Sequence, residues 1–403
     1  MKPNFDETHK RIHTNSIKWD FAYQNGVLQK REIETVNLAA GDLLPMWIAD
    51  MDFQTAPPIL EAIQQRVQHG IFGYSLPDES YYDAIISWMA RRQNWQVERD
   101  WILTTSSVLF TLSVAVQTFT EPGDKVIVQT PVFKPFYQTI ESNGRLLSRN
   151  PLVYENGRYH IDFDDLAEKA SDPHAKMLIL CSPHNPVGRV WSREELHQIG
   201  TICQQHDIMI VSDEIHSNLI YPWAEFTPFG AVDEAFHDRL ILCNSPTKTF
   251  NTPGIRTATT FIPNTAIRSQ FFTALHQLNE SFGVSTIGTL VLQTAYNQGE
   301  EWLEELMVYL EANLHFLQTY IDQHLPQLHV VRPEAMFLVW VDCRALGLDA
   351  TALQHLFYDK ARVYLEEGSK YGPEGEGFMR FNIGCPRSTL EVALERIRLA
   401  LSG

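Results

Sequence analysis

Between Trp101 and Ile262 the chain alternates short β-rich runs with longer amphipathic stretches. This alternation is typical of βαβ units and predicts a mainly parallel sheet that carries helices on its faces. The runs are almost continuously apolar, as expected for strands that are covered on both sides. The predicted strands are residues 126–129, 177–181, 208–212, 240–244 and 257–262.

A helix is predicted directly after the hydroxyl-rich run 104–107. Ser106 and Ser107 are suited to cap it, because a side-chain oxygen at a helix start accepts a hydrogen bond from a backbone N–H. The residues that follow have the spacing of one helical face, namely Val108, Leu109, Leu112, Val116 and Phe119.

Length and patterning indicate two domains in the 403 residues. Beyond about residue 280 a long helical region is followed by two more predicted strands, residues 328–331 and 337–342, which indicates a smaller α+β domain. The first 50 residues are irregular and lack a core of their own. We predict an N-terminal segment (1–50) that packs on the small domain, a large α/β domain (51–285) and the small C-terminal domain (286–403).

Composition excludes several classes of function. The chain has 32 Lys and Arg against 49 Asp and Glu, a net charge of −17, which argues against a nucleic-acid partner. It has no apolar run of the ~20 residues that cross a bilayer and no apolar leader at its start. The five cysteines are scattered without metal-ligand spacing, as in reduced intracellular proteins. We expect a cytoplasmic protein with neither a membrane nor a metal partner.

Two charged residues lie at the ends of predicted strands. Lys248 follows strand 240–244, where α/β proteins build their sites, and a desolvated lysine can form a Schiff base. Taken alone, Lys248 is better interpreted as a solvated loop residue. Asp213 follows strand 208–212, and a buried carboxylate there either pairs with a cation or caps a helix. A metal pair of Asp213 and His216 lacks a third ligand of suitable spacing.

A third strand, 177–181, is followed by a Pro-rich turn in which Asn185 is free to donate, although an amide in such a turn also caps its own backbone. Three strand ends and a hydroxyl-rich helix start together favour a phosphorylated aromatic cofactor, since a helix N-terminus binds phosphate. Ser245 and Arg256 are suited to complete the phosphate site.

Four motifs, in order along nearly the whole chain, resemble those of fold-type I pyridoxal-phosphate enzymes. The similarity is to the cystathionine β-lyase branch of the class I/II aminotransferase family. The motifs are PMWIADMDF (45–53), FGYSLPDESYYDAI (72–85), SPTKTFNTPG (245–254) and FMRFNIGCPRSTLEVALERI (378–397). The resemblance implies an aspartate-aminotransferase-like fold, a pyridoxal 5'-phosphate cofactor and an amino-acid substrate.

The resemblance also implies a role for each matching residue. Lys248 would hold the cofactor as a Schiff base and shuttle protons, and Asp213 would keep the pyridine nitrogen protonated. Asn185 and His216 would bond the phenolic oxygen of the ring, and Phe133 would stack on its face. The phosphate contacts would come from Ser107, Val108, Leu109, Ser245 and Arg256. Arg380 would bind the substrate carboxylate, and Tyr74 would reach the phosphate of a neighbouring subunit, which implies a homodimer. Without the motifs, Phe133 would be a core aromatic residue and Tyr74 a buried one.

The predicted reaction is α,β-elimination of L-cystathionine or a related cysteine S-conjugate to a thiol, pyruvate and ammonia. His216 stands where many aminotransferases of this fold have tyrosine, and the His form is typical of the lyase branch. Asn218 and Phe133 depart from that branch, where an acid and a tyrosine are common, so the substrate preference stays open. The alternatives are a class I/II aminotransferase and a regulatory protein of this fold that binds a transcription factor.

Overall fold

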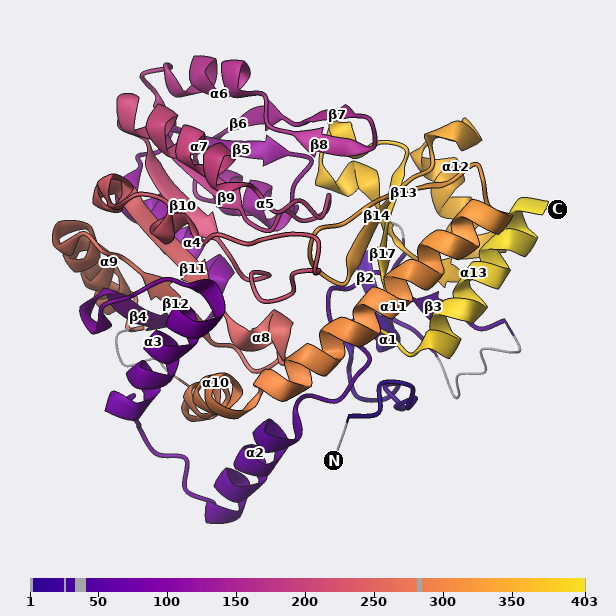
Figure 1. The fold of residues 1–403 in the computed structure, drawn as a ribbon, viewed down its shortest axis with the longest axis horizontal. Coiled ribbons are helices and arrows are strands. Elements are labelled where there is room, and N and C mark those ends of the chain that lie inside the picture. Colours follow the sequence, from indigo (N-terminus) through magenta and orange to yellow (C-terminus); the bar gives the residue numbers. More distant parts are fainter. Residues whose placement is uncertain (1–2, 25–26, 33–40, 281–284, 403) are drawn as a thin grey trace.

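The computed structural model describes residues 3–24, 27–32, 41–280 and 285–402. Its largest sheet has seven strands in the order β4-β12-β11-β10-β9-β5-β6 (Figure 1). Only β12 runs antiparallel to its neighbours in this sheet, so the predicted mainly parallel α/β fold is confirmed. The strands are β4 (Ile102–Thr105), β5 (Lys125–Thr130), β6 (Leu146–Pro151), β9 (Ala175–Cys181), β10 (Met209–Asp213), β11 (Leu240–Asn244) and β12 (Ala258–Phe261). All five predicted strands are present, whereas β4 and β6 were not predicted.

Helices cover both faces of this sheet. Alternate residues of β9 separate the two cores: Met177 and Ile179 belong to one buried cluster, and Leu178 and Leu180 belong to the other. This arrangement explains why the strands are apolar throughout. The first cluster contains α4 (Val108–Phe119), α5 (Pro135–Ser142) and α9 (Thr265–Gln277), and the second contains α6 (Phe163–Ala170) and α7 (Arg193–Gln205).

A second, antiparallel sheet lies on the right of Figure 1 and has the strand order β13-β14-β17-β16. The long helix α11 crosses this half of the molecule and packs against α13 and β13. The elements are α11 (Glu300–His324), β13 (His329–Val331), β14 (Leu338–Asp342), α12 (Ala350–Gln354), β15 (Val363–Tyr364), β16 (Glu366–Glu367), β17 (Phe378–Asn382) and α13 (Arg387–Ser402). This is the α+β region expected near the C-terminus.

Three further helices adjoin the two sheets: α2 (Pro57–His69), α3 (Glu79–Gln93) and α10 (Thr286–Gln298). Helix α10 packs against α2 and α3, so an element of the predicted small domain contacts elements of the predicted large one. The division at residue 285 therefore stays a prediction. No helix in the described part of the chain combines the length and the apolar character that spanning a bilayer requires.

The N-terminal segment contains more regular structure than expected. Helix α1 (Ile17–Asp20) leads into β1 (Phe21–Gln24), which pairs antiparallel with β2 (Val27–Lys30), and β3 (Leu44–Pro45) pairs with β15. Outside this segment, β7 (Val153–Glu155) and β8 (Arg158–His160) form a separate antiparallel pair. Trp47 stacks on Tyr364, with ring centroids 4.5 Å apart. The first 50 residues thus contact the C-terminal region through β3 and Trp47. Residues 1–2, 25–26 and 33–40 of this segment lie outside the described residues.

Candidate active site

A cavity of about 280 Å³ lies beyond the carboxyl ends of β9, β10 and β11. In an α/β sheet this edge is where ligands bind, because the loops that follow parallel strands converge there. Ten of the predicted site residues line the cavity: Ser107, Val108, Leu109, Phe133, Asn185, Asp213, His216, Ser245, Lys248 and Arg256. The sequence positions chosen from three different strands are thus brought together in one place.

Lys248 lies in the short helix α8 (Pro246–Thr249), which Ser245 caps by accepting a hydrogen bond from the Thr247 N–H. The lysine Nζ donates to the Ala49 carbonyl over 2.7 Å. Burial lowers the pKa of the Lys248 amine to about 8, although nearby acidic groups oppose the shift. An amine with this pKa is partly unprotonated near neutral pH and is therefore a competent nucleophile and base.

Asp213 is the last residue of β10 and is buried at the cavity wall. Its carboxylate accepts one hydrogen bond, from the Ile215 N–H over 3.1 Å. Burial raises the pKa of Asp213 to about 7, and the hydrogen bond and the charge of Lys248 only partly offset that increase. A cation placed against this carboxylate would restore its ionised form.

Glu214, the next residue, is fully buried but does not line the cavity. Its Oε1 accepts hydrogen bonds from the Ser212 hydroxyl and the Phe229 N–H, and its Oε2 is buried without a partner among the described residues. Burial raises the pKa of Glu214 to about 8. The two adjacent carboxyl groups therefore share a raised pKa but differ in their access to a ligand.

We expect Glu214→Gln to change the pH dependence of stability. Folded Glu214 has a pKa of about 8 and keeps its proton up to that pH, whereas the unfolded chain releases it near the ordinary pKa of 4.5, so its contribution to stability is lost as pH rises between these values. Glutamine does not titrate, so the variant should gain about 3 to 4 kcal/mol relative to the parent between pH 5 and pH 8. Urea unfolding of the cofactor-free proteins measures this difference, and a difference that does not vary with pH would contradict it.

Arg380 of β17, in the second sheet, is buried and does not line the cavity itself, but it contacts the lining residue Asn185. Its Nη1 donates to Oδ1 of Asn185 over 3.1 Å, and its Nη2 donates to the Trp47 carbonyl over 2.7 Å. The Arg380 guanidinium also lies over the ring of Tyr371, 5.2 Å from its centroid. Two of its N–H groups are thereby held, while its Nε is buried without a hydrogen-bond partner among the described residues and could donate to a ligand.

The start of α4 lies at the cavity wall. Ser107 caps this helix by accepting a hydrogen bond from the Phe110 N–H over 3.2 Å. The N–H groups of Val108 and Leu109 belong to the first turn, where no acceptor exists within a helix, so they suit an anion. The exposed Arg256 side chain adds a positive charge at the same wall, whereas the Ser245 hydroxyl donates to the Thr257 carbonyl over 2.7 Å.

Two ring side chains complete the wall. Phe133 is half-buried, and its N–H donates to the Asn185 carbonyl over 3.1 Å. His216 is buried with its ring edge-on to Phe337, and its Nδ1 has no hydrogen-bond partner among the described residues. Burial lowers the pKa of His216 well below its usual value, and the positive charges of Lys248 and Arg380 act in the same direction. His216 is therefore neutral at physiological pH.

Tyr74 does not lie in the cavity. Its side chain is fully exposed in the loop between α2 and α3, so it is not a buried tyrosine. Three other apolar side chains of the same loop, Ile71, Phe72 and Leu76, are also exposed. Figure 1 shows this loop at the lower edge of the molecule, outside the layers.

Ser106, predicted at the helix start, also lines the cavity, whereas sequence reasoning did not assign Ala49, Cys181, Ile215, Thr247, Pro253 and Thr257. Ala49 lies inside the PMWIADMDF motif, and Thr247 and Pro253 lie inside SPTKTFNTPG, so these motifs were the available signals. The described residues contain no cluster of three or more His, Cys, Asp or Glu side chains able to hold a metal ion.

A mainly parallel seven-stranded sheet with a half-buried lysine at its carboxyl edge, beside a second antiparallel sheet that supplies a buried arginine, defines an aspartate-aminotransferase-like fold. The chain belongs to the aminotransferase class I and II family, whose family model matches residues 33–397.

Two curated relatives and one solved structure are similar along almost their whole length. The chain is 43% identical over 399 residues to the cystathionine beta-lyase PatB of Bacillus subtilis, which covers 99% of this chain and 100% of that protein. It is 34% identical to the protein MalY of Escherichia coli over 96% of each chain. The crystal structure of cystalysin from Treponema denticola, which contains a pyridoxal 5'-phosphate cofactor, matches with a TM-score of 0.92 and 32% identity over 100% of this chain and 99% of that one.

Proposed function

We propose that this protein is a pyridoxal-phosphate-dependent carbon–sulfur β-lyase. It would convert L-cystathionine or a related cysteine S-conjugate to a thiol, pyruvate and ammonia. The observation that carries the proposal is the half-buried Lys248 amine, which lies in one cavity with Asp213 and Asn185, the latter hydrogen-bonded to Arg380. The 43% identity to a cystathionine beta-lyase supports the substrate class.

The residues of the cavity fit pyridoxal phosphate. The buried Asp213 carboxylate has a raised pKa that a cationic ring nitrogen would relieve. The unpartnered Nδ1 of His216 is a buried polar atom that a polar ligand atom would satisfy. The first turn of α4 and Arg256 suit a phosphate. When bound, the cofactor supplies a ring that takes up the electron pair of the broken Cα–H bond.

The side chains would divide the work as follows. Arg380 would bind the substrate carboxylate in a two-pronged contact. Lys248, with its lowered pKa, would take the proton from Cα as a general base. Asp213 would keep a proton on the ring nitrogen, while Asn185 and His216 would bond the ring oxygen. The sulfur at Cβ would then leave as a thiolate.

The proposal is tested by supplying the purified protein with cofactor and L-cystathionine and no added keto acid. We expect pyruvate and free thiol to form in equal amounts. An aminotransferase would need a keto acid to turn over repeatedly and would release no thiol. Continued turnover that depends on keto acid, without thiol, would overturn the lyase assignment.

We also propose that the protein is a homodimer in the cytoplasm. The exposed apolar loop that carries Ile71, Phe72, Tyr74 and Leu76 is suited to contact a second copy of the chain. Through this loop Tyr74 would reach the phosphate held by the partner. The free state of all five cysteines is in keeping with a reducing compartment.

Mixed dimers test the role of Tyr74. If each site combines Lys248 of one chain with Tyr74 of the other, Tyr74→Ala and Lys248→Ala should each be nearly inactive alone. Unfolding and reassembling them together should make about half of the dimers mixed, each with one intact site, so about a quarter of wild-type activity should return. A mixture of Lys248→Ala with Asp213→Ala is the control, because both residues lie in one chain's cavity and no intact site can form. No recovery in the first mixture would place Tyr74 outside the site.

A further inference from the structure

Residues 47–52 form a segment whose main chain is used by the two basic side chains of the site. The Trp47 carbonyl accepts from Nη2 of Arg380, and the Ala49 carbonyl accepts from Nζ of Lys248, each over 2.7 Å. The position of this segment therefore determines where both basic groups point.

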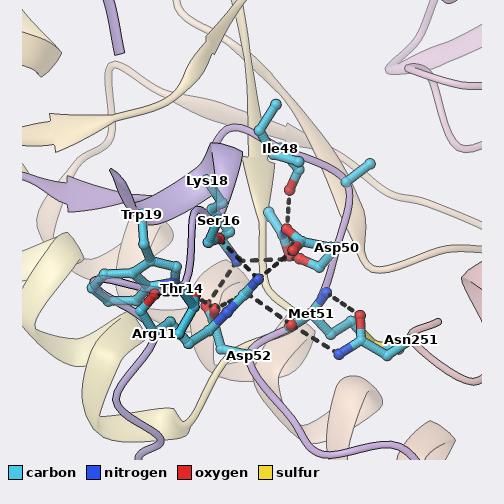
Figure 2. Close-up of polar contacts among 12 residues, drawn as sticks. Arg11, Thr14, Ser16, Lys18, Trp19, Ile48, Asp50, Met51, Asp52 and Asn251 are labelled. Atoms are coloured by element: carbon cyan, nitrogen blue, oxygen red, sulfur yellow. Dashed lines mark hydrogen bonds and ion pairs between the residues drawn. The ribbon is translucent and has the colours of Figure 1, made fainter. Parts of the chain in front are cut away.

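A charged cluster from the N-terminal segment holds residues 47–52 in place (Figure 2). Arg11 donates from Nη2 to Asp50 over 2.5 Å and from Nη1 to Asp52 over 2.6 Å. The fully buried Lys18 donates to Asp52 over 2.7 Å and to the Asp50 carbonyl over 3.2 Å. Nε1 of Trp19 also donates to Asp52, over 2.8 Å. The neighbouring cations hold the pKa of Asp52 below its usual value although the group is buried.

Two asparagines hold the same segment from the other side. Asn251, three residues after Lys248, donates to the carbonyls of Met51 and Phe53 and accepts from the Met51 N–H. Asn382 of β17, two residues after Arg380, donates to the carbonyls of Ile48 and Asp50. The segment thus connects the element that carries Lys248 to the element that carries Arg380.

We propose that Arg11 and Asp50 are positioning residues for Lys248. Arg11 fixes the Asp50 carboxylate and the 47–52 segment, so that the Ala49 carbonyl orients the lysine amine while the Asp50 carboxylate, paired with Arg11, lies near it. A role of these residues in catalysis rests on the proposed function. Their effect on the Lys248 amine, however, can be measured without any reaction.

The charges around Lys248 make the proposal specific. The groups that face its amine are Asp50 on the segment, Asp213 on β10 and Arg380 on β17, together with the neutral His216. Asp50 is the strongest of the charges that favour the protonated amine, and Arg11 partly neutralises it. Removing Asp50 and removing Arg11 should therefore shift the pKa of Lys248 in opposite directions.

The measurement uses the full chain without cofactor. Acetic anhydride is applied over a range of pH, and mass spectrometry of peptides follows acetylation of Lys248, which gives its pKa. We expect Asp50→Asn to lower this pKa by about one unit and Arg11→Gln to raise it by about one unit. Arg11→Lys keeps the charge and should restore the parent value. Arg239→Gln is the matched control. Arg239 pairs with Asp207 at the end of β11 opposite to Lys248, and its side chain is 18% exposed, against 21% for Arg11.

The outcomes distinguish a positioning role of Arg11 and Asp50 from a general loss of structure around Lys248. A purely structural role would let water reach Lys248 in both variants and raise its pKa in both toward 10.5. Shifts in the same direction, or none, would overturn the proposal. If Arg11→Gln does not fold, the expected decrease in Asp50→Asn alone decides. Failure of the lyase assay would leave this result unchanged, so the two proposals are tested separately.

Discussion

Lys248→Ala abolishes carbon–sulfur cleavage, even with cofactor in excess: this is the largest effect that we expect from a single substitution. Lys248 lines the cavity, and we propose that its amine holds the cofactor and takes the Cα proton. General-base catalysis alone contributes about 10²–10⁴-fold, so the rate should fall by at least about 10³-fold. Release of pyruvate from L-cystathionine measures the effect.

A matched substitution separates chemistry from stability. Lys125 pairs with Asp172 on the surface over 2.5 Å, and Lys125→Ala should retain parental activity. Borohydride reduction of the yellow, cofactor-loaded parent, followed by mass spectrometry, should place the reduced cofactor on Lys248. A Lys248→Ala protein that keeps more than about a tenth of the activity, or an adduct on another lysine, would contradict the assignment.

The central sheet could be predicted because its local signals agree with its tertiary environment. Strands β5, β9, β10, β11 and β12 are apolar runs with helices on both faces, so the pattern alone reveals them. Strand β6 was missed because five of its residues 146–151 are exposed or half-buried, and the only buried one is the polar Asn150. The N-terminal hairpin was missed because the side chains of β2 are exposed and give no hydrophobic pattern.

The site was predictable where a residue follows a buried strand. Lys248 and Asn185 lie just beyond strand ends and Asp213 is the last residue of its strand, and parallel strands bring such ends together. Arg380 comes from a different sheet, so only the resemblance identified it. Ala49 acts through its backbone carbonyl, which every residue type has, so the residue type at this position does not indicate the role. Ion pairs that depend on the packing of segments distant in sequence, such as the pair of Arg11 and Asp50, cannot be predicted from the sequence pattern either.

The second large effect is expected from Asp213→Asn. Asparagine has the same shape and can still accept the Ile215 N–H, so the end of β10 should keep its structure. It carries no charge, however, and cannot hold a proton on the ring nitrogen of the cofactor. The loss of this charge-assisted buried contact should cost at least ~2 kcal/mol in transition-state stabilisation, or about thirtyfold in rate.

Glu214→Gln is the control that makes the Asp213 result interpretable. The two acids are neighbours, both are buried, and burial raises the pKa of both, to about 7 and about 8. Only Asp213 lines the cavity, so only its substitution should slow the reaction, while Glu214→Gln should stay within about twofold of the parent. Equal losses of rate in the two variants would mean that the rate depends on any buried acidic group at the end of β10. Asp213 would then not be the partner of the cofactor nitrogen.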